Sequence, residues 1–182
     1  MSATGLMTMA APIEAVERGE ETPFEQAMRR HERLVLVTAL RLLGNLPDAQ
    51  DAAQEVFLRL YRNRGMLQSP ALAGWLYRVT VNVCHDVRRR RPEAAAEWDG
   101  PAEAPNPQQQ MVEAERRRVL EMSLRALPEK ERAALVLRDL EGLSTAEVAE
   151  ILGSSEATVR SQISKARVKV RDFVERYFRR RS

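Results

Sequence analysis

This sequence of 182 residues lacks several features that whole classes of protein require. It has one cysteine, Cys84, so no disulfide can form within the chain, and a reducing compartment such as the cytoplasm is favoured. No apolar run approaches the roughly 20 residues of a membrane helix. The first 21 residues lack the basic start and apolar core of a secretory signal. We therefore expect no membrane insertion.

Residues suited to covalent or metal chemistry are also scarce. The two histidines, His31 and His85, do not stand with Cys84 at the spacing of a metal site. The sequence has no Gly-rich phosphate loop, no nucleophile elbow and no paired-carboxylate signature. We therefore expect no enzyme, no cofactor and no metal, and we look for a binding function.

Charge, by contrast, is plentiful and unevenly placed. Twenty-nine Lys and Arg residues against 26 Asp and Glu give a net charge of only +3. Four consecutive arginines nevertheless occupy positions 88–91, and the C-terminal tail ends in another basic run. Local basic blocks in a chain of modest net charge are typical of a protein that contacts nucleic acid in patches.

The most informative stretch is 143–169, which predicts two short helices joined by a tight turn. Ser144 and Glu147 have the spacing of a capping box, and Gly153 suits a left-handed helix end. Ser154 or Ser155 can cap the second helix. The apolar positions share one face of each helix: Val148, Ala149 and Leu152, then Val159, Ile163, Ala166 and Val170.

The pattern of this stretch fits a helix-turn-helix, in which the second helix enters the major groove of DNA. The opposite face of that second helix is polar and basic, and it carries Thr158, Arg160, Ser161, Gln162, Ser164, Lys165 and Arg167. An ordinary helical hairpin with a solvated basic face is the alternative.

The rest of the sequence predicts an all-α protein with two small helical domains, 23–91 and 111–182. A flexible arm at 1–22 precedes them. The segment 92–110 has four acids, four prolines and no basic residue, so it is predicted to be a linker.

Two helices of the predicted first domain carry unusual exposed faces. The helix from Pro47 to Arg62 places Asp48, Asp51, Gln54 and Glu55 beside an exposed Leu58. These acids either stabilise the helix N-terminus or mark a partner surface. The next helix, predicted to begin at Ser69-Pro70, exposes Arg78, Asn82, His85 and Arg89 and ends in the four arginines. This stripe is either a solvated helix end or an edge that contacts phosphates.

Together these motifs resemble the sigma-70 family of bacterial transcription initiation factors, in particular its small extracytoplasmic-function group. The resemblance lies in DAQDAAQEVFLRLYRN, in WLYRVTVNVCHDVRRRR, and in ALPEKERAALVLRDLEGLSTAEVAEILGSSEATVRSQISKAR, in that order. It implies a protein that binds core RNA polymerase, directs it to promoters through the minus-thirty-five and minus-ten elements, and promotes DNA melting.

The resemblance also implies roles for particular positions. Asp48, Asp51, Gln54, Glu55 and Leu58 would contact the clamp helices of the largest polymerase subunits. The minus-ten set would be Arg64, Met66, Gln68, Arg78, Asn82, Arg88, Arg89 and Arg90, with the loop 64–71 holding a flipped base. The polar face of the recognition helix would read the minus-thirty-five element. The implied partners are core polymerase, including its flap, promoter DNA and an anti-sigma factor.

The sequence departs from the family pattern in three places. Met66, Gln68, Ser69 and Pro70 replace an aromatic and a Gly-Asp-Ser-like turn, which leaves the flipped base open. Ser154 follows Gly153 where an apolar residue is usual, and Gln162 and Lys165 replace commoner arginines. Two other hypotheses remain. A stand-alone helix-turn-helix regulator would leave the first domain idle, and a sigma mimic that binds an anti-sigma factor should lose the basic recognition face.

Overall fold

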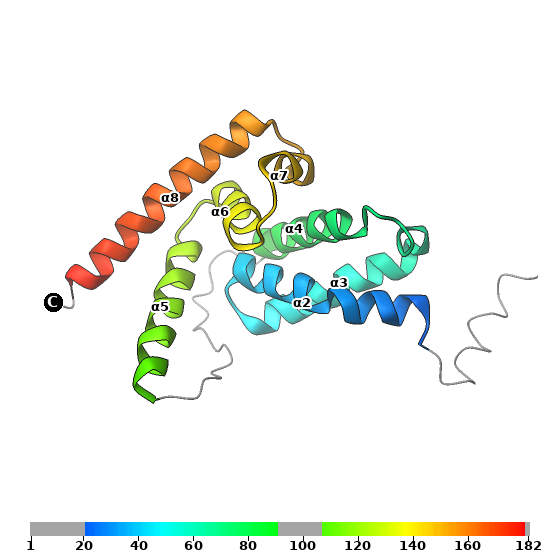
Figure 1. The fold of residues 1–182 in the computed structure, drawn as a ribbon, viewed down its shortest axis with the longest axis horizontal. Helices are drawn as coiled ribbons and strands as arrows, with labels where there is room; N and C mark the ends of the chain where they lie inside the picture. Colours follow the sequence, from blue (N-terminus) through cyan, green and yellow to red (C-terminus); the bar gives the residue numbers. More distant parts are fainter. Residues whose placement is uncertain (1–20, 91–106, 181–182) are drawn as a thin grey trace, which may run out of the picture.

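The computed structural model describes residues 21–90 and 107–180, and throughout these ranges the chain consists of helices and connecting turns (Figure 1). Most of the predicted N-terminal arm and linker lies outside the described residues. The helix α5 begins at Pro107, so it includes the last residues of the segment 92–110 that is predicted to be a linker. Within the described ranges, no helix is both long and apolar enough to cross a membrane.

Three helices and a short 3-10 turn form the first domain: α2 (Pro23–Leu43), α3 (Leu46–Arg62), η1 (Arg64–Met66) and α4 (Leu72–Arg90). Thr22 caps α2 in a capping box with Glu25, and Gly44 ends the helix at φ 79°. The buried face of α3 follows helical periodicity and has six members: Ala49, Ala52, Ala53, Val56, Phe57 and Leu60.

The start of α4 differs from the prediction that Ser69-Pro70 begins the helix. Ser69 instead closes a turn, because its Oγ accepts the N–H of Ala71 at 3.2 Å and its carbonyl accepts the N–H of Leu72 at 3.1 Å. The helix then begins at Leu72. The loop 64–71 is therefore a compact succession of turns rather than a helix entry.

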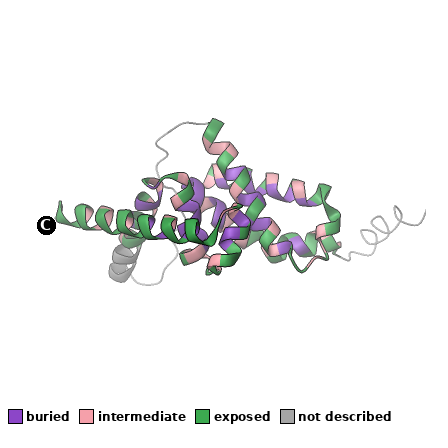
Figure 2. Cartoon of the chain, turned by 90° about the horizontal axis from the view of Figure 1, so that it is seen from above, coloured by how far each residue is buried: buried purple, intermediate pink, exposed green. Residues whose placement is uncertain are grey.

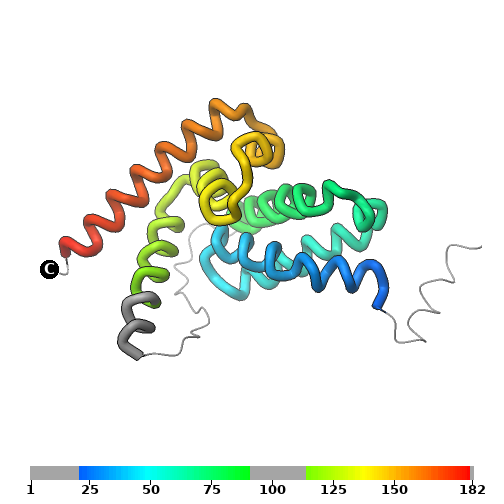
Figure 3. The backbone as a smooth tube through the Cα atoms, in the orientation of Figure 1, coloured from blue at the N-terminus to red at the C-terminus, as the bar shows by residue number. Residues whose placement is uncertain are grey.

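The second domain holds α5 (Pro107–Arg125), α6 (Glu129–Leu135), η2 (Val136–Leu140), α7 (Thr145–Leu152) and α8 (Glu156–Arg179). The tube in Figure 3 shows α8 running away from α7 to the C-terminal end. Its outer half is exposed on most sides (Figure 2). The short η2 is a π-helical turn, closed by the N–H of Glu141 on the carbonyl of Val136 at 2.9 Å.

The helix-turn-helix prediction is confirmed in its local details. Ser144 and Glu147 form both bonds of the capping box, and Gly153 has φ 58°. Ser155, not Ser154, caps α8. One core position is corrected: Ile151 is buried where Leu152 was expected, and Leu152 is only half-buried.

The two domains pack against each other through α4, α2 and α7 of the described chain, with α5 and η2 also touching α2. In Figure 1, α7 lies next to α4, the helix of the first domain that it contacts. Buried side chains of both domains join in one hydrophobic cluster. Tyr77, Thr80 and Cys84 of α4 are buried, and the Tyr77 hydroxyl donates to Glu141 of the second domain at 3.2 Å.

Glu121 on α5 is half-buried, and the effect of its burial can be tested. Burial raises the pKa of its carboxyl from 4.5 to about 7, against the lowering effect of Arg117 and Arg125. Its Oε2 has no hydrogen-bond partner among the described residues. Because the folded protein holds this proton more tightly, the wild type loses stability as pH rises from about 4.5 to about 7.

Glu121→Gln should therefore increase the free energy of unfolding at pH 8 relative to pH 5. We expect a gain of about 1 kcal/mol, because half-exposure leaves much of the charge screened by water. Urea unfolding at the two pH values measures it. Glu175→Gln, on the exposed face of α8, controls for the loss of one negative charge. Equal stability changes at both pH values would contradict the assigned cause.

Candidate functional site

The acidic face of α3 contains residues with different local roles. Asp51, Gln54 and Leu58 are exposed, and Leu58 retains 50% of its accessible surface. Asp48 instead belongs to the helix cap: Asn45 Oδ1 accepts its N–H, and Asn45 Nδ2 donates to its carboxylate, both at 2.9 Å. Glu55 is half-buried and accepts from Arg59 Nε at 2.8 Å. The freely presented part of this face is thus Asp51, Gln54 and Leu58.

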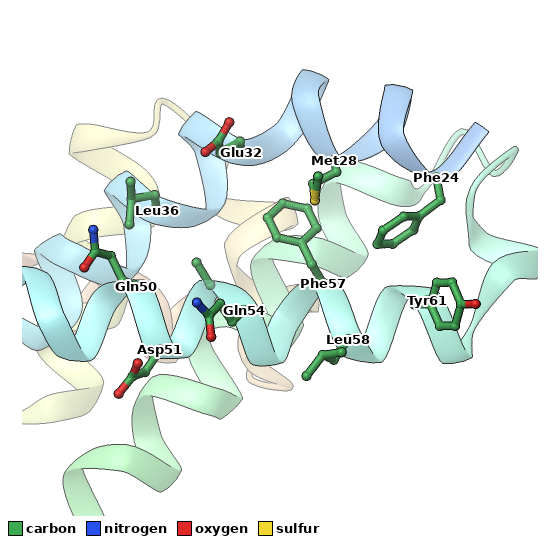
Figure 4. A pocket seen from close by; sticks show the side chains of 11 residues that line it. Phe24, Met28, Glu32, Leu36, Gln50, Asp51, Gln54, Phe57, Leu58 and Tyr61 are labelled. Atoms are coloured by element: carbon green, nitrogen blue, oxygen red, sulfur yellow. The ribbon is translucent and has the colours of Figure 1, made fainter. Parts of the chain in front are cut away.

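A groove of about 850 Å³ runs between α2 and α3 beside this face. Figure 4 shows Phe24 and Met28 of α2 pointing towards Phe57 of α3. Glu32 and Asp51 add negative charge to its lining. Met28 is 38% exposed, although it lies at helical spacing from the buried Val35 of the same helix. The sequence did not predict that α2 lines this groove, because a helix that lines a groove has the same apolar periodicity as a helix buried in a core.

The loop 64–71 lies at the far end of α3. The guanidinium of Arg64 stacks over the Tyr61 ring at 4.2 Å, and that ring meets Phe24 edge-on at 5.3 Å. Tyr61 is 49% exposed, so an aromatic surface stands beside the loop although the loop itself has none. Gln68 is exposed and Met66 is half-buried.

The predicted basic edge of α4 is divided in the structure. Asn82, Arg89 and Arg90 are exposed. Arg78 instead reaches the second domain, where its Nη2 donates to the Glu150 carbonyl at 3.0 Å. Arg88 is half-buried and donates to the carbonyl of Leu42 at 3.3 Å. Arg78 is exposed, as predicted, but its guanidinium is engaged by the second domain, and the Arg88 guanidinium is engaged by the end of α2.

The predicted recognition helix is the N-terminal half of α8, where Ser161, Ser164 and Lys165 are exposed. Thr158 is part of the helix cap, with its N–H on Ser155 Oγ at 3.1 Å. Arg160 is exposed and pairs with Glu156 at 2.9 Å. Gln162 is half-buried.

Arg167 differs from the other basic residues of this helix. Its guanidinium makes two hydrogen bonds to Asp139 of η2, at 2.8 and 2.7 Å, and this carboxylate raises the pKa of Arg167. The π-helical turn thus fixes one predicted contact residue in place.

A second groove, of about 410 Å³, lies between η2 and α8. Arg160, Ser164 and Arg167, predicted from the sequence, line it together with Arg138, Thr145 and Arg171, which the sequence reasoning missed. Arg160 and Arg167 are paired with Glu156 and Asp139, and Arg138 and Arg171 bring two further guanidinium groups to the lining. This positive charge suits anions such as backbone phosphates. The helical periodicity of the sequence does not place Arg138 beside the recognition helix, because a π-helical turn sets the direction of its side chain.

The described residues contain no group of three or more His, Cys, Asp or Glu side chains that could hold a metal ion. The exposed features are an acidic, partly apolar groove on the first domain and a basic groove on the second.

Comparison with known families decides between the remaining interpretations. The family model for Sigma-70 region 2 matches residues 27–93, and that for Sigma-70, region 4 matches residues 117–170. This chain belongs to the sigma-70 family, in its extracytoplasmic-function (ECF) group. Most residues that line the acidic groove lie in the region 2 match, and most that line the basic groove lie in the region 4 match; Phe24 and Arg171 lie just outside them.

Individual sigma factors are similar over most of the chain. The ECF RNA polymerase sigma factor SigE of Mycolicibacterium smegmatis is 38% identical over 160 residues, covering 85% of this chain and 62% of SigE. The ECF RNA polymerase sigma-E factor of Escherichia coli is 32% identical over 182 residues, covering 92% of this chain and 95% of that factor.

The fold is similar to that of the Bartonella quintana sigma factor RpoE, solved with the anti-sigma factor NepR. The TM-score is 0.69 at 19% identity, over 84% of this chain and 96% of that one. At this identity the similarity concerns the fold.

Proposed function

We propose that this sigma factor binds core RNA polymerase through its first domain and directs it to promoters through both domains. The observation that carries the proposal is the placement of an acidic, apolar groove in region 2 and a basic groove in region 4 of one chain. Each module alone would bind weakly, but two modules held on one polymerase gain effective concentration and selectivity.

The groove between α2 and α3 is the proposed surface for the clamp helices of the polymerase. Exposed Leu58 and Met28 offer apolar contact area, and Asp51 and Glu32 suit a basic partner. The second domain is proposed to contact the flap.

Minus-ten recognition is assigned to the loop 64–71 and to Asn82, Arg89 and Arg90 of α4. Extruding a base costs a few kcal/mol of stacking. Stacking on an aromatic ring offsets such a cost, and the exposed ring beside this loop is Tyr61. The exposed arginines of α4 would hold the backbone next to it.

The minus-thirty-five element is assigned to the recognition helix in α8. Ser161, Lys165 and Arg160 face outward and would reach base edges in the major groove. Arg138 and Arg171 would hold phosphates from the groove beside it.

Run-off transcription with purified core polymerase tests the function. On genomic promoter fragments, the chain should produce transcripts with defined start sites that core alone does not make. A stand-alone regulator would bind duplex DNA without producing such transcripts, and a sigma mimic would bind neither core nor promoter productively.

Lys165→Ala tests the assignment of the recognition helix. Lys165 is exposed on the proposed DNA face, so its loss should weaken binding of minus-thirty-five duplex by about tenfold and lower the salt slope by about 1. Electrophoretic mobility shifts at several salt concentrations measure both. Arg176→Ala, at the far exposed end of the same helix, is the charge-matched control. Equal losses from the two variants would point to a diffuse electrostatic effect instead.

An anti-sigma factor is a further proposed partner, as membership of the ECF group suggests. Affinity capture of the chain from cells, with identification of a protein that blocks run-off transcription in a purified reaction, would test this. A captured protein without effect on transcription would not qualify.

A further inference from the structure

One arginine of the recognition helix is held by a carboxylate from another element of the second domain. Arg167 donates from Nε and Nη2 to the two carboxylate oxygens of Asp139, at 2.8 and 2.7 Å. Asp139 lies in η2, 28 residues earlier in the chain. A planar fork bound to both oxygens fixes the direction of a guanidinium as well as its distance. The pair therefore constrains the geometry of the helix that is assigned to the minus-thirty-five element.

The turn that carries Asp139 is firmly anchored in the core. Val136 and Leu137 of η2 are fully buried, and the Asp139 side chain is 25% exposed. The pair between Arg160 and Glu156 differs, because it joins two exposed side chains one turn apart on α8. Such exposed local pairs contribute little and hold neither partner strongly. Asp139 is thus the carboxylate that imposes a position on the recognition helix from outside it.

Asp139 also changes what Arg167 can offer to DNA. It accepts from two of the five guanidinium N–H groups, leaves three for another acceptor, and compensates the positive charge. Arg167 lines the groove between η2 and α8 together with Arg138 and Arg171. An arginine without a carboxylate partner attracts any phosphate and strengthens binding to every DNA sequence. A compensated arginine with a fixed direction contributes only where an acceptor lies in the right place.

We propose that Asp139 is a specificity-determining residue of this sigma factor and that it acts through Arg167. It directs the guanidinium towards one acceptor of the minus-thirty-five duplex and cancels the attraction of Arg167 for the phosphates of other sequences. Asp139 is a positioning residue, because Arg167 makes the contact with DNA. The inference rests on the proposed function, since it assumes that α8 binds the minus-thirty-five element.

Asp139→Asn in the full chain tests this with two duplexes of equal length. One carries the segment upstream of a start site mapped by run-off transcription, and the other carries the same bases in scrambled order. Without the compensating charge, Arg167 joins the phosphate contacts. The affinity for the scrambled duplex should therefore rise about fivefold, and the slope of log affinity against log salt should steepen by about 1.

The affinity of Asp139→Asn for the promoter duplex should not rise, because the lost directed hydrogen bond offsets the new phosphate contact. The ratio of promoter to scrambled affinity should thus fall by about fivefold or more. Asp172→Asn makes the same chemical change at an exposed position of α8. As the matched control, it should leave this ratio unchanged.

The double variant Arg167→Ala, Asp139→Asn shows whether Asp139 acts through Arg167. It removes both charges, so its salt slope and its affinity for the scrambled duplex should match those of the wild type. Its affinity for the promoter duplex should fall about tenfold, and its affinity ratio should equal that of Arg167→Ala alone.

Two results would overturn the inference. An equal rise of both affinities in Asp139→Asn would mean that Asp139 acts only as a negative charge near DNA. An equal fall of both affinities, with a lower melting temperature, would mean that it only supports the fold. A wild type that does not distinguish the two duplexes would instead contradict the proposed function.

Discussion

Leu58→Arg should reduce the affinity of the chain for core polymerase by about 100-fold or more. Leu58 is half exposed on the rim of the α2–α3 groove, and Met28 and Phe57 extend the apolar part of the groove lining, which suits a partner with apolar contact area. The substitution removes that contact and adds a charge that the interface would have to desolvate. The affinity is measured by competition for core polymerase against a labelled copy of the wild type.

Two controls separate this effect from damage to the fold. Leu120→Arg makes the same change at a leucine of α5 that is 37% exposed, away from the groove, and it should retain core binding. Leu58→Arg itself should keep its affinity for minus-thirty-five duplex, because the recognition helix belongs to the other domain. Core binding equal to that of the wild type would show that the acidic groove is not the polymerase surface.

The structure also changes which variants are informative on this face. Glu55→Arg would disturb the bond from Arg59 to Glu55 as well as the surface. Asp48 is engaged in the cap of α3. Substitutions at Asp51 and Leu58 change only presented groups, so they test partner binding with less effect on helix stability.

Local features were predictable from the sequence because their causes are local. The capping box of Ser144 and Glu147, the left-handed Gly153 and the buried face of α3 each depend on residues within a few positions of one another. Helix periodicity and cap chemistry therefore sufficed for the elements and for the position of the helix-turn-helix.

What could not be predicted depends on contacts between distant segments. Tyr77 and Arg78 appear in the sequence as members of a helix that serves only its own domain. Their partners, Glu141 and Glu150, lie 64 and 72 residues further along the chain. No spacing rule connects such pairs, and the same holds for the binding of Arg167 by Asp139 across 28 residues.

Arg132 is a further residue whose role depends on contacts that the sequence does not predict. In the sequence it stands in the charged run EKER and reads as a solvated helix residue, yet it is 1% exposed. Its guanidinium donates four hydrogen bonds to backbone carbonyls: Leu124 at 2.6 Å, Arg125 at 2.7 Å, Leu127 at 2.8 Å and Leu42 at 2.9 Å. It thereby satisfies the C-terminal end of α5 and ties α2 to the second domain.

Arg132→Met should lower the free energy of unfolding by about 3–5 kcal/mol. Methionine fills similar space, but it leaves these buried carbonyls without donors, and each such loss carries a desolvation cost. Arg132→Lys should recover only part of the loss, because an ammonium group cannot reproduce the planar fork that reaches several carbonyls at once. Arg138→Met, six positions along and half exposed, is the matched control and should change stability by less than about 1 kcal/mol.

Urea unfolding followed by circular dichroism measures the three variants. A loss of under about 1 kcal/mol for Arg132→Met would mean that water or relaxed backbone replaces the guanidinium. The loss should also be larger than that from removing a single contact between the domains, as in Glu141→Gln, because three of the four carbonyls lie within the second domain itself. Arg132 therefore contributes more to the stability of the second domain than to the contact between the domains. A substitution meant to separate the domains without unfolding either of them should leave Arg132 unchanged.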